Sequence, residues 1–215
     1  MQMSPRIGWV ALSLVILLSK ISLAANLLTN GSFEIPVVDT PTQEFANGGD
    51  IGGWTAVTQS ELLTDAYNEN SGTLHFDAQD GNQSLDLTGP GNQGSGGVTQ
   101  TVTLTPGQLY TLTFYVGNQD NSLSNYAANS TLDLQINDVD QGLFTNSDST
   151  TNEVNWKKMT FQFTPSVASN KIGFFLANGN DNYLGLDNVS LNLPEPTVTA
   201  LLCAGLAALA SRRRD

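Results

Sequence analysis

The chain contains little of what most cross-linked or catalytic domains need. Its 215 residues include one cysteine, Cys203, and one histidine, His75. An intrachain disulfide is therefore excluded, and the body of the protein has no cysteine ligand for zinc. Long stretches of helical periodicity are also missing after residue 26, which argues against a helical or mixed α/β domain.

Positive charge is equally scarce. Between Ala25 and Leu193 the only basic residues are Lys157, Lys158 and Lys171, whereas 18 residues are acidic. Nucleic-acid binding requires clustered lysine and arginine, so nucleic acid is excluded as a partner. The composition suits an exported protein that stays soluble through charge repulsion.

The N-terminus has the layout of a secretory signal peptide. Arg6 precedes an apolar run over residues 7–18, and small residues including Ala24 and Ala25 follow it. A charged start, an apolar middle and small residues at the end are typical of a cleaved export signal. We therefore expect residues 1–25 to be a signal peptide that begins as a helix.

The C-terminus combines three ordered elements: Pro194-Glu195-Pro196, an apolar segment over residues 197–210, and Arg212-Arg213-Arg214. The 14 apolar residues form a helix of about 21 Å, shorter than the roughly 30 Å of a bilayer core. The arginines would stay on the cytoplasmic side of the membrane. The sequence predicts a short transmembrane helix that holds the exported chain at the membrane.

This tail, residues 194–215, resembles the PEP-CTERM sorting signal. The resemblance implies a partner enzyme of the exosortase type, a Gram-negative bacterium that makes exopolysaccharide, and a protein anchored transiently in the inner membrane before it reaches the cell surface or matrix. Cys203 would then be discarded with the membrane segment.

Residues 26–193 are expected to form one all-β domain. Apolar and polar residues alternate with a period of two in segments separated by glycine, proline, asparagine and aspartate. Such segments are half-buried strands, and their spacing favours an antiparallel two-sheet sandwich or jelly roll. The clearest examples are residues 110–116, 132–136, 158–163 and 172–176.

The last predicted strand changes phase. Leu184 and Leu186 occupy even positions, whereas Val189 and Leu191 occupy odd positions, so in a regular strand the two pairs would face opposite sides of the sheet. A slip of one residue in a buried strand requires a β-bulge. The bulge would redirect the carboxylate of Asp187.

An ordered set of short motifs resembles the choice-of-anchor C group of bacterial exported proteins and a plant cell-wall domain family of unknown function. Both are similar to galactose-binding-like jelly rolls, the fold of many carbohydrate-binding modules. The motifs occupy residues 26–34, 52–54, 80–87, 98–102, 106–110 and 185–191.

The resemblance also implies a structural calcium ion. In such modules an acidic residue near the first strand and an aspartate in the last strand often bind Ca²⁺ with backbone carbonyls, which here would be Glu34 and Asp187. Calcium prefers six to eight oxygen ligands, and it would join the first strand to the last in a domain without disulfides. The alternative is that Glu34 is a solvated charge and Asp187 an Asx-turn residue.

Exposed aromatic side chains are the candidates for sugar binding. Tyr67, Tyr126 and Tyr183 lie in polar segments where a ring could contact a sugar. Trp54 and Trp156 are expected in the core instead. Residues 137–142 contain acidic positions like a calcium loop but lack its final glutamate, so a hairpin turn is expected there.

The sequence shows no catalytic motif. His75 is expected on a partly buried strand, and no serine elbow accompanies it. The favoured function is a secreted, non-enzymatic module that binds polysaccharide or a cell-surface glycan or builds an extracellular biofilm matrix. A matrix protein without saccharide affinity and a polysaccharide hydrolase with paired carboxylates are the alternatives.

Overall fold

The computed structural model describes residues 25–69, 74–89, 96–119, 129–148, 152–177 and 183–194. The predicted signal peptide, membrane segment, Tyr126 and Cys203 lie outside these ranges. None of the described residues forms a helix that is long and apolar enough to cross a bilayer.

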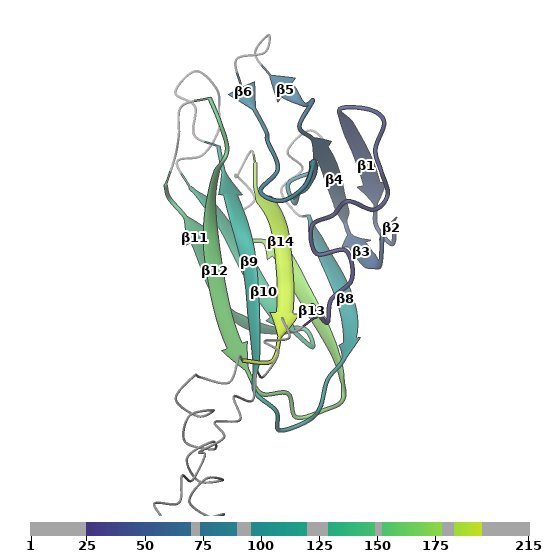
Figure 1. Ribbon diagram of the computed structural model, residues 1–215, viewed down its shortest axis with the longest axis vertical. Coiled ribbons are helices and arrows are strands. Elements are labelled where there is room, and N and C mark those ends of the chain that lie inside the picture. Colours follow the sequence, from purple (N-terminus) through teal and green to yellow (C-terminus); the bar gives the residue numbers. More distant parts are fainter. Residues whose placement is uncertain are drawn as a thin grey trace, which may run out of the picture.

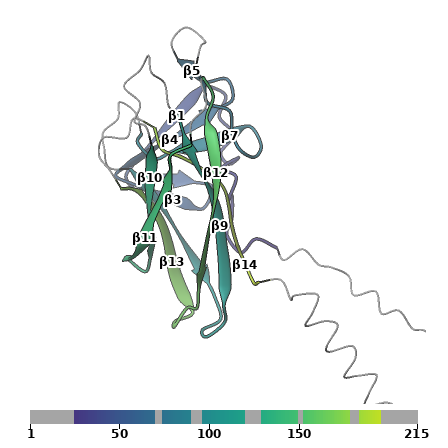
Figure 2. The same cartoon turned by 90° about the vertical axis from the view of Figure 1, so that its left-hand side faces the viewer.

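Two six-stranded sheets face each other (Figures 1 and 2). The first sheet has the order β1 (Thr42–Ala46), β4 (Gln59–Thr64), β7 (Gln83–Asp86), β14 (Gly185–Asn192), β9 (Tyr110–Asn118) and β12 (Asn155–Phe163). The second has the order β11 (Val139–Asn146), β10 (Ser130–Ile136), β13 (Ser169–Leu176), β8 (Gly97–Thr103), β3 (Trp54–Val57) and β2 (Asp50–Ile51). A short hairpin adds β5 (Asn68–Glu69) and β6 (Leu74–His75).

Neighbouring strands in both sheets run antiparallel. From β7 onward the chain moves repeatedly from one sheet to the other, as in a jelly roll. The prediction of an antiparallel two-sheet β-sandwich is therefore confirmed. The predicted terminal helices lie outside the described residues.

The alternation read from the sequence places the core between the sheets. On β9, Leu112 and Phe114 are fully buried, and Phe114 contacts Phe174 of β13 with ring centroids 5.0 Å apart. Trp54 is also fully buried, as expected, and its indole N–H donates to the carbonyl of Asn30 at 3.1 Å. Burial of these large rings supplies much of the hydrophobic stabilisation in the absence of disulfides.

A second, smaller core lies on the outer face of the first sheet. It consists of Leu63, Leu74, Phe76 and Tyr183, with Tyr67 and Val154 packed against it. The β5–β6 hairpin and the segment after it therefore cover one end of this face, the upper end in Figure 1. The remainder of the face has no such cover from the described residues.

The turn between β10 and β11 is a hairpin turn, as predicted. Asn137 and Asp138 have φ values of 55° and 64°. Two consecutive residues with positive φ are typical of a type I′ turn, which asparagine and aspartate tolerate.

The first described segment runs along the last strand, so the expected meeting of the two ends of the domain is confirmed. The N–H of Leu27 donates to the Leu191 carbonyl at 3.0 Å, and the N–H of Val189 donates to the Gly31 carbonyl at 2.8 Å. A Cβ atom at Gly31 would collide with the Val189 carbonyl, so this close approach requires glycine.

The predicted bulge in β14 is present. The register of β14 against β9 shifts between Asp187 and Ser190, and Asn188 has a φ of 46°. The bulge leaves Asp187 on the outer face of the first sheet, where its side chain is completely buried beneath the segment that follows β6.

Candidate functional site

The outer face of the first sheet brings together chemically distinctive side chains from three adjacent strands. Cross-strand pairing places the outward residues of β14, β9 and β12 in rows. Four rows are Gly185–Gly117–Trp156, Asp187–Tyr115–Lys158, Ser190–Thr113–Thr160 and Asn192–Thr111–Gln162. We call these residues the outer-sheet face.

Two glycines make room for the ring of Trp156. A Cβ atom on Gly117 would lie 2.9 Å from Cζ3 of Trp156, and one on Gly185 would lie 2.7 Å from its Cη2. The six-membered ring therefore covers both glycines. The indole N–H donates to the Asp77 carbonyl at 3.0 Å, which fixes the orientation of the half-buried ring.

The prediction that Trp156 belongs to the main core is wrong. On β12, the residues with core parity are Met159, Phe161 and Phe163, which pack against the main core. Trp156 has the opposite parity and pairs with Gly117 on the outer face. The positions of Met159, Phe161 and Phe163 in the sequence already assign Trp156 to the opposite face of a regular strand, and the pairing of Trp156 with Gly117 confirms that direction.

Hydroxyl and amide groups continue the outer-sheet face below Trp156. The hydroxyls of Thr113 and Ser190 are hydrogen-bonded at 2.6 Å, and the Gln162 amide donates to the Thr111 hydroxyl at 3.0 Å. Lys158 is exposed. The face thus offers many neutral hydrogen-bonding groups and one accessible positive charge.

A buried polar cluster lies at the covered end of the same face. Asp86 on β7 is 7% exposed, and its Oδ1 accepts hydrogen bonds from the N–H and hydroxyl of Thr88, both at 2.8 Å, and from the N–H of Leu184 at 3.3 Å. Burial raises the pKa of Asp86 to about 7, although these hydrogen bonds oppose the shift and the Glu61 charge adds to it. Asp86 is therefore a carboxyl that exchanges its proton near neutral pH.

Two hydroxyls next to Asp86 have no hydrogen-bond partner among the described residues. They belong to Ser84 and Tyr183, which are 0% and 3% exposed. A Cβ atom on Gly185 would lie 2.5 Å from the Tyr183 hydroxyl, so this oxygen sits directly over the glycine and beside the Trp156 ring. Burial, followed by the negative charge of Asp86, raises the pKa of Tyr183 well above its usual value.

Tyr183 is consequently not the exposed sugar platform that the sequence predicted. Its ring packs edge-on against Phe76 at 5.0 Å, and the half-buried ring of Tyr67 contacts the same Phe76 at 5.1 Å. The structure thus brings two of the three predicted tyrosines together, as parts of the small core. The third, Tyr126, lies outside the described residues. His75 is exposed on β6 rather than partly buried as expected.

Asp187 and Glu34 hold one turn between them. Asp187 Oδ2 accepts the N–H groups of Gln79 and Asp80 at 2.8 and 2.9 Å, and its Oδ1 accepts the N–H of Asn188 at 2.6 Å. Burial raises the pKa of Asp187 to about 7, with these hydrogen bonds opposing the shift. Glu34 Oε1 accepts the N–H groups of Asn82 and Gln83, both at 2.8 Å.

This geometry bears on the predicted calcium ion. The groups that point at these carboxylate oxygens are N–H donors, whereas Ca²⁺ needs a shell of oxygen ligands. No group of three or more aspartate, glutamate, histidine or cysteine residues in the described part of the chain could hold a metal ion. In the observed arrangement, Glu34 and Asp187 fit the role of acceptors for a backbone turn better than that of calcium ligands.

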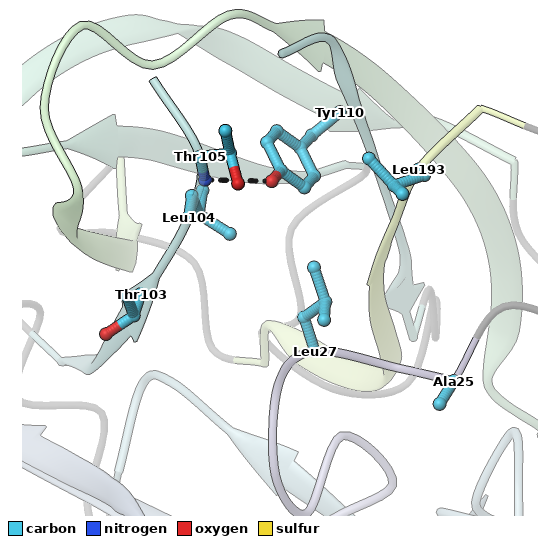
Figure 3. Close-up of a pocket in the computed structure, with 7 residues that line it drawn as sticks. All are labelled: Ala25, Leu27, Thr103, Leu104, Thr105, Tyr110 and Leu193. Atoms are coloured by element: carbon cyan, nitrogen blue, oxygen red, sulfur yellow. Dashed lines mark hydrogen bonds between the residues drawn. The ribbon is translucent and has the colours of Figure 1, made fainter. Parts of the chain in front are cut away.

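A pocket of about 460 Å³ lies at the other end of the sandwich (Figure 3). The side chains of Leu27, Leu104 and Tyr110 converge on it, and the hydroxyl of Tyr110 accepts a hydrogen bond from the N–H of Thr105 at 3.0 Å. The other lining residues are Ala25, Thr103 and Leu193. The pocket carries no ionisable side chain apart from the tyrosine hydroxyl, so it suits an apolar occupant.

Sequence reasoning missed the residues that define the outer-sheet face and its buried cluster. Trp156, Tyr115, Asp86 and Ser84 come from three strands that are far apart along the chain. One local signal was available: Gly117 interrupts the outward series Thr111, Thr113 and Tyr115, and a glycine within a strand often marks close approach by another group.

The chain is similar to the CBM22-1 xylan-binding domain of Paenibacillus barcinonensis Xyn10C, with 16% identity over 81% of this chain and 97% of that domain and a TM-score of 0.47. It is also similar to a family 35 carbohydrate-binding module from Clostridium thermocellum, with 14% identity over 69% of this chain and 97% of that module and a TM-score of 0.41. No curated protein matches the sequence.

A family model described as "HpiC1-like: HpiC1 cyclase" matches residues 24–192. This match covers most of the chain, including every strand of the two sheets. The chain therefore belongs to the HpiC1-like family.

Proposed function

We propose that this chain is an exported, non-catalytic module that binds extracellular polysaccharide through its outer-sheet face. The observation that carries the proposal is the ring of Trp156, held over Gly117 and Gly185 and followed along the sheet by rows of hydroxyl and amide groups.

This combination matches the chemistry of a sugar. The C–H groups on one face of a pyranose ring pack on an aromatic ring, while its hydroxyls need neutral donors and acceptors at fixed positions. Thr113, Ser190 and Thr160 supply hydroxyls, and Gln162 supplies an amide. From Trp156 to Gln162 the strand extends about 20 Å, which favours a polymer over a single sugar.

Retention of the chain in affinity gels tests the proposal, using polysaccharides of the producing strain. We expect the unmodified chain to be retarded and Trp156→Ala to lose about tenfold in affinity. Aromatic stacking contributes about 0.5–1.5 kcal/mol beyond the apolar area that it buries, and about 1.4 kcal/mol corresponds to a tenfold change. Leu143→Ala is the matched control, since Leu143 is 64% exposed on β11 in the other sheet.

A second variant separates a loss of binding from a misfolding of Trp156→Ala. Thr160→Val keeps the shape of an exposed β12 side chain but removes its hydroxyl, and we expect weaker retention with an unchanged denaturation midpoint. Failure of the unmodified chain to bind any of these polysaccharides would contradict the proposal. That result would favour a matrix protein that builds biofilm without saccharide affinity.

We also propose that the two ends of the chain direct this module to the cell surface or the extracellular matrix. Residues 1–25 would be removed on export, and residues 197–210 would hold the chain in the inner membrane until an exosortase-type enzyme processes the tail. Mass spectrometry of secreted and membrane fractions tests this. Loss of the residues after Pro196 from the secreted form is expected, and an intact C-terminus there would contradict it.

The raised pKa of Asp86 supports a second candidate function, that of an enzyme. A carboxyl with a pKa of about 7 can donate or accept a proton at neutral pH, as general acid–base catalysis requires. The family description names a cyclase, and a hydrolase could pair Asp86 with Glu61, its neighbour across β7 and β4. Asp86→Asn would abolish ring closure or release of reducing ends in either enzyme, whereas a binding module would keep its glycan affinity.

A further inference from the structure

The segments that build one end of the sandwich carry no charged side chain, although the domain as a whole is strongly acidic. This end contains the β8–β9 hairpin, the β12–β13 connection, the start of the described chain and the end of β14. No aspartate, glutamate, lysine or arginine occurs in the segments that build it, which are residues 25–29, 101–110, 163–170 and 192–194. We call this region the uncharged end; it is the lower end in Figure 1.

The segments of the uncharged end lie against one another. The N–H of Gly107 donates to the Pro165 carbonyl at 2.9 Å, and the N–H of Leu104 donates to the Ala168 carbonyl at 2.8 Å. The charged pair nearest to it in the chain is Lys171–Asp138, whose side chains bond at 2.6 Å and cancel. The segments of the uncharged end thus form one surface without charged side chains of their own. It is bordered by the β10–β11 hairpin, whose Asn137 bonds Asn170 and Lys171 and which carries Asp138 and the exposed Asp140, and cleavage of the proposed signal peptide would add one α-amino group.

This end also exposes large apolar side chains. Leu27, Leu109, Val167 and Leu193 are 41%, 40%, 49% and 46% exposed. Leu27 and Leu193 flank the apolar pocket of Figure 3, beside Leu104 and Tyr110. Of these four residues, Leu27 and Leu193 line the pocket, and Leu109 and Val167 belong to the connections at the same end. Several exposed apolar residues at one end, with a pocket between two of them, indicate a contact surface rather than scattered surface variation.

The end of the last strand lies close in sequence to the predicted membrane segment, which bears on the binding partner of this surface. β14 ends at Asn192, within the uncharged end, and the predicted membrane segment begins at Thr197. The chain from Pro194 to Thr197 spans at most about 11 Å when fully extended. While residues 197–210 lie in the membrane, the uncharged end therefore faces the bilayer at close range.

We infer that the uncharged end docks onto the lipid surface, with Leu109, Val167 and the pocket between Leu27 and Leu193 contacting the boundary between headgroups and acyl chains. The inference rests on the proposed membrane anchor. Anionic lipids repel an acidic domain, so an end without carboxylates that exposes apolar side chains is the part of this molecule best suited to that contact. Docking would fix the upright orientation of the domain, with Trp156 and the covered end of the first sheet toward the extracellular polymer.

Fluorescence quenching by brominated lipids tests the contact. The full chain carries Cys203→Ser and one new cysteine, at Val167 or Leu109, labelled with an environment-sensitive dye and reconstituted into phosphatidylethanolamine–phosphatidylglycerol vesicles. We expect brominated acyl chains to quench the dye at both positions by about twofold or more. The control is His75→Cys, exposed near the far end of β9, about 27 Å from the uncharged end, where no quenching is expected.

A charge-insertion variant provides a second measurement. Val167→Asp should reduce quenching of a dye at Leu109, because a carboxylate at the lipid boundary is costly. If the chain floats with the vesicles but all three positions are quenched equally, docking is overturned and the anchor stands. If the chain does not float with the vesicles, the anchor and the docking are both overturned.

Discussion

Glu34 and Asp187 hold the turn at residues 79–83 from its two ends. Asp187 accepts the first pair of N–H groups, from Gln79 and Asp80, and Glu34 accepts the last pair, from Asn82 and Gln83. Two carboxylates from opposite ends of the domain thus satisfy four backbone donors of one loop. This turn lies directly after the segment that covers the outer-sheet face, so the carboxylates position that cover.

The hydrogen bonds of these carboxylates lead to a prediction about calcium. The melting temperature should be the same in millimolar calcium and in excess chelator, because N–H donors already occupy Glu34 Oε1 and both oxygens of Asp187. Thermal denaturation followed by circular dichroism measures this. An increase of several degrees with calcium, absent in Glu34→Gln, would contradict this prediction and support the calcium site that the sequence predicted.

Removal of Glu34 should loosen the turn. Glu34→Ala leaves the N–H groups of Asn82 and Gln83 without their acceptor, and we expect a loss of about 1–3 kcal/mol in the free energy of unfolding. Urea denaturation measures the loss. Glu44→Ala on β1 is the matched control, because Glu44 is exposed and should change stability little. Equal effects of the two substitutions would contradict the assigned role.

Stability should fall as the pH rises through neutrality. The pKa of Asp86 is about 7 in the folded protein, above the ordinary 3.8, so the folded state binds this proton more tightly than the unfolded state does. The same holds for Asp187. Their contribution is complete below about pH 4 and is lost as the pH increases through about 7.

Asp86→Asn separates this effect from general charge repulsion. The neutral amide should increase the free energy of unfolding at pH 8 by about 1–3 kcal/mol and flatten its decline between pH 5 and pH 8. Urea denaturation at several pH values measures both changes. Asp39→Asn, which removes an exposed carboxylate, should leave the slope almost unchanged. An unchanged slope in Asp86→Asn would show that the buried carboxyl is already charged in the folded protein throughout this range.

The close contact between Trp156 and Gly117 gives a prediction for packing. Gly117→Ala should cost about 1–3 kcal/mol, since the new methyl group would lie 2.9 Å from the indole ring. In a Trp156→Leu background the same substitution should cost much less, because the ring is gone. This double-mutant cycle isolates the contact. Additive effects would mean that the ring does not cover the glycine.

The alternation of single strands was sufficient to predict the fold. Residues 110–116, 132–136 and 172–176 became β9, β10 and β13 with the expected inward faces, because period-two alternation reports directly on a half-buried strand. The bulge at Asp187 was also predictable. The buried residues of this strand change from even to odd positions, and only an extra residue in the strand keeps both sets facing the core.

Side-chain exposure in loops and the composition of the site were less predictable. Tyr183 was expected to be exposed because its neighbours are polar, yet Phe76 from a distant segment buries it. Trp156 was assigned to the core because it opens a strand with a core-facing side, yet its position is on the opposite side of that strand, over Gly117 and Gly185. In both cases the decisive contact comes from a residue far away in the chain.

The sequence by itself determined the class of fold and the uncharged character of particular segments, because each depends on local composition or period. Only the tertiary structure decided which strands are neighbours. That choice gathers Trp156, Tyr183 and Asp86 on one sheet face and collects four charge-free segments at one end, because lateral order and register in a sheet depend on contacts between residues remote in sequence.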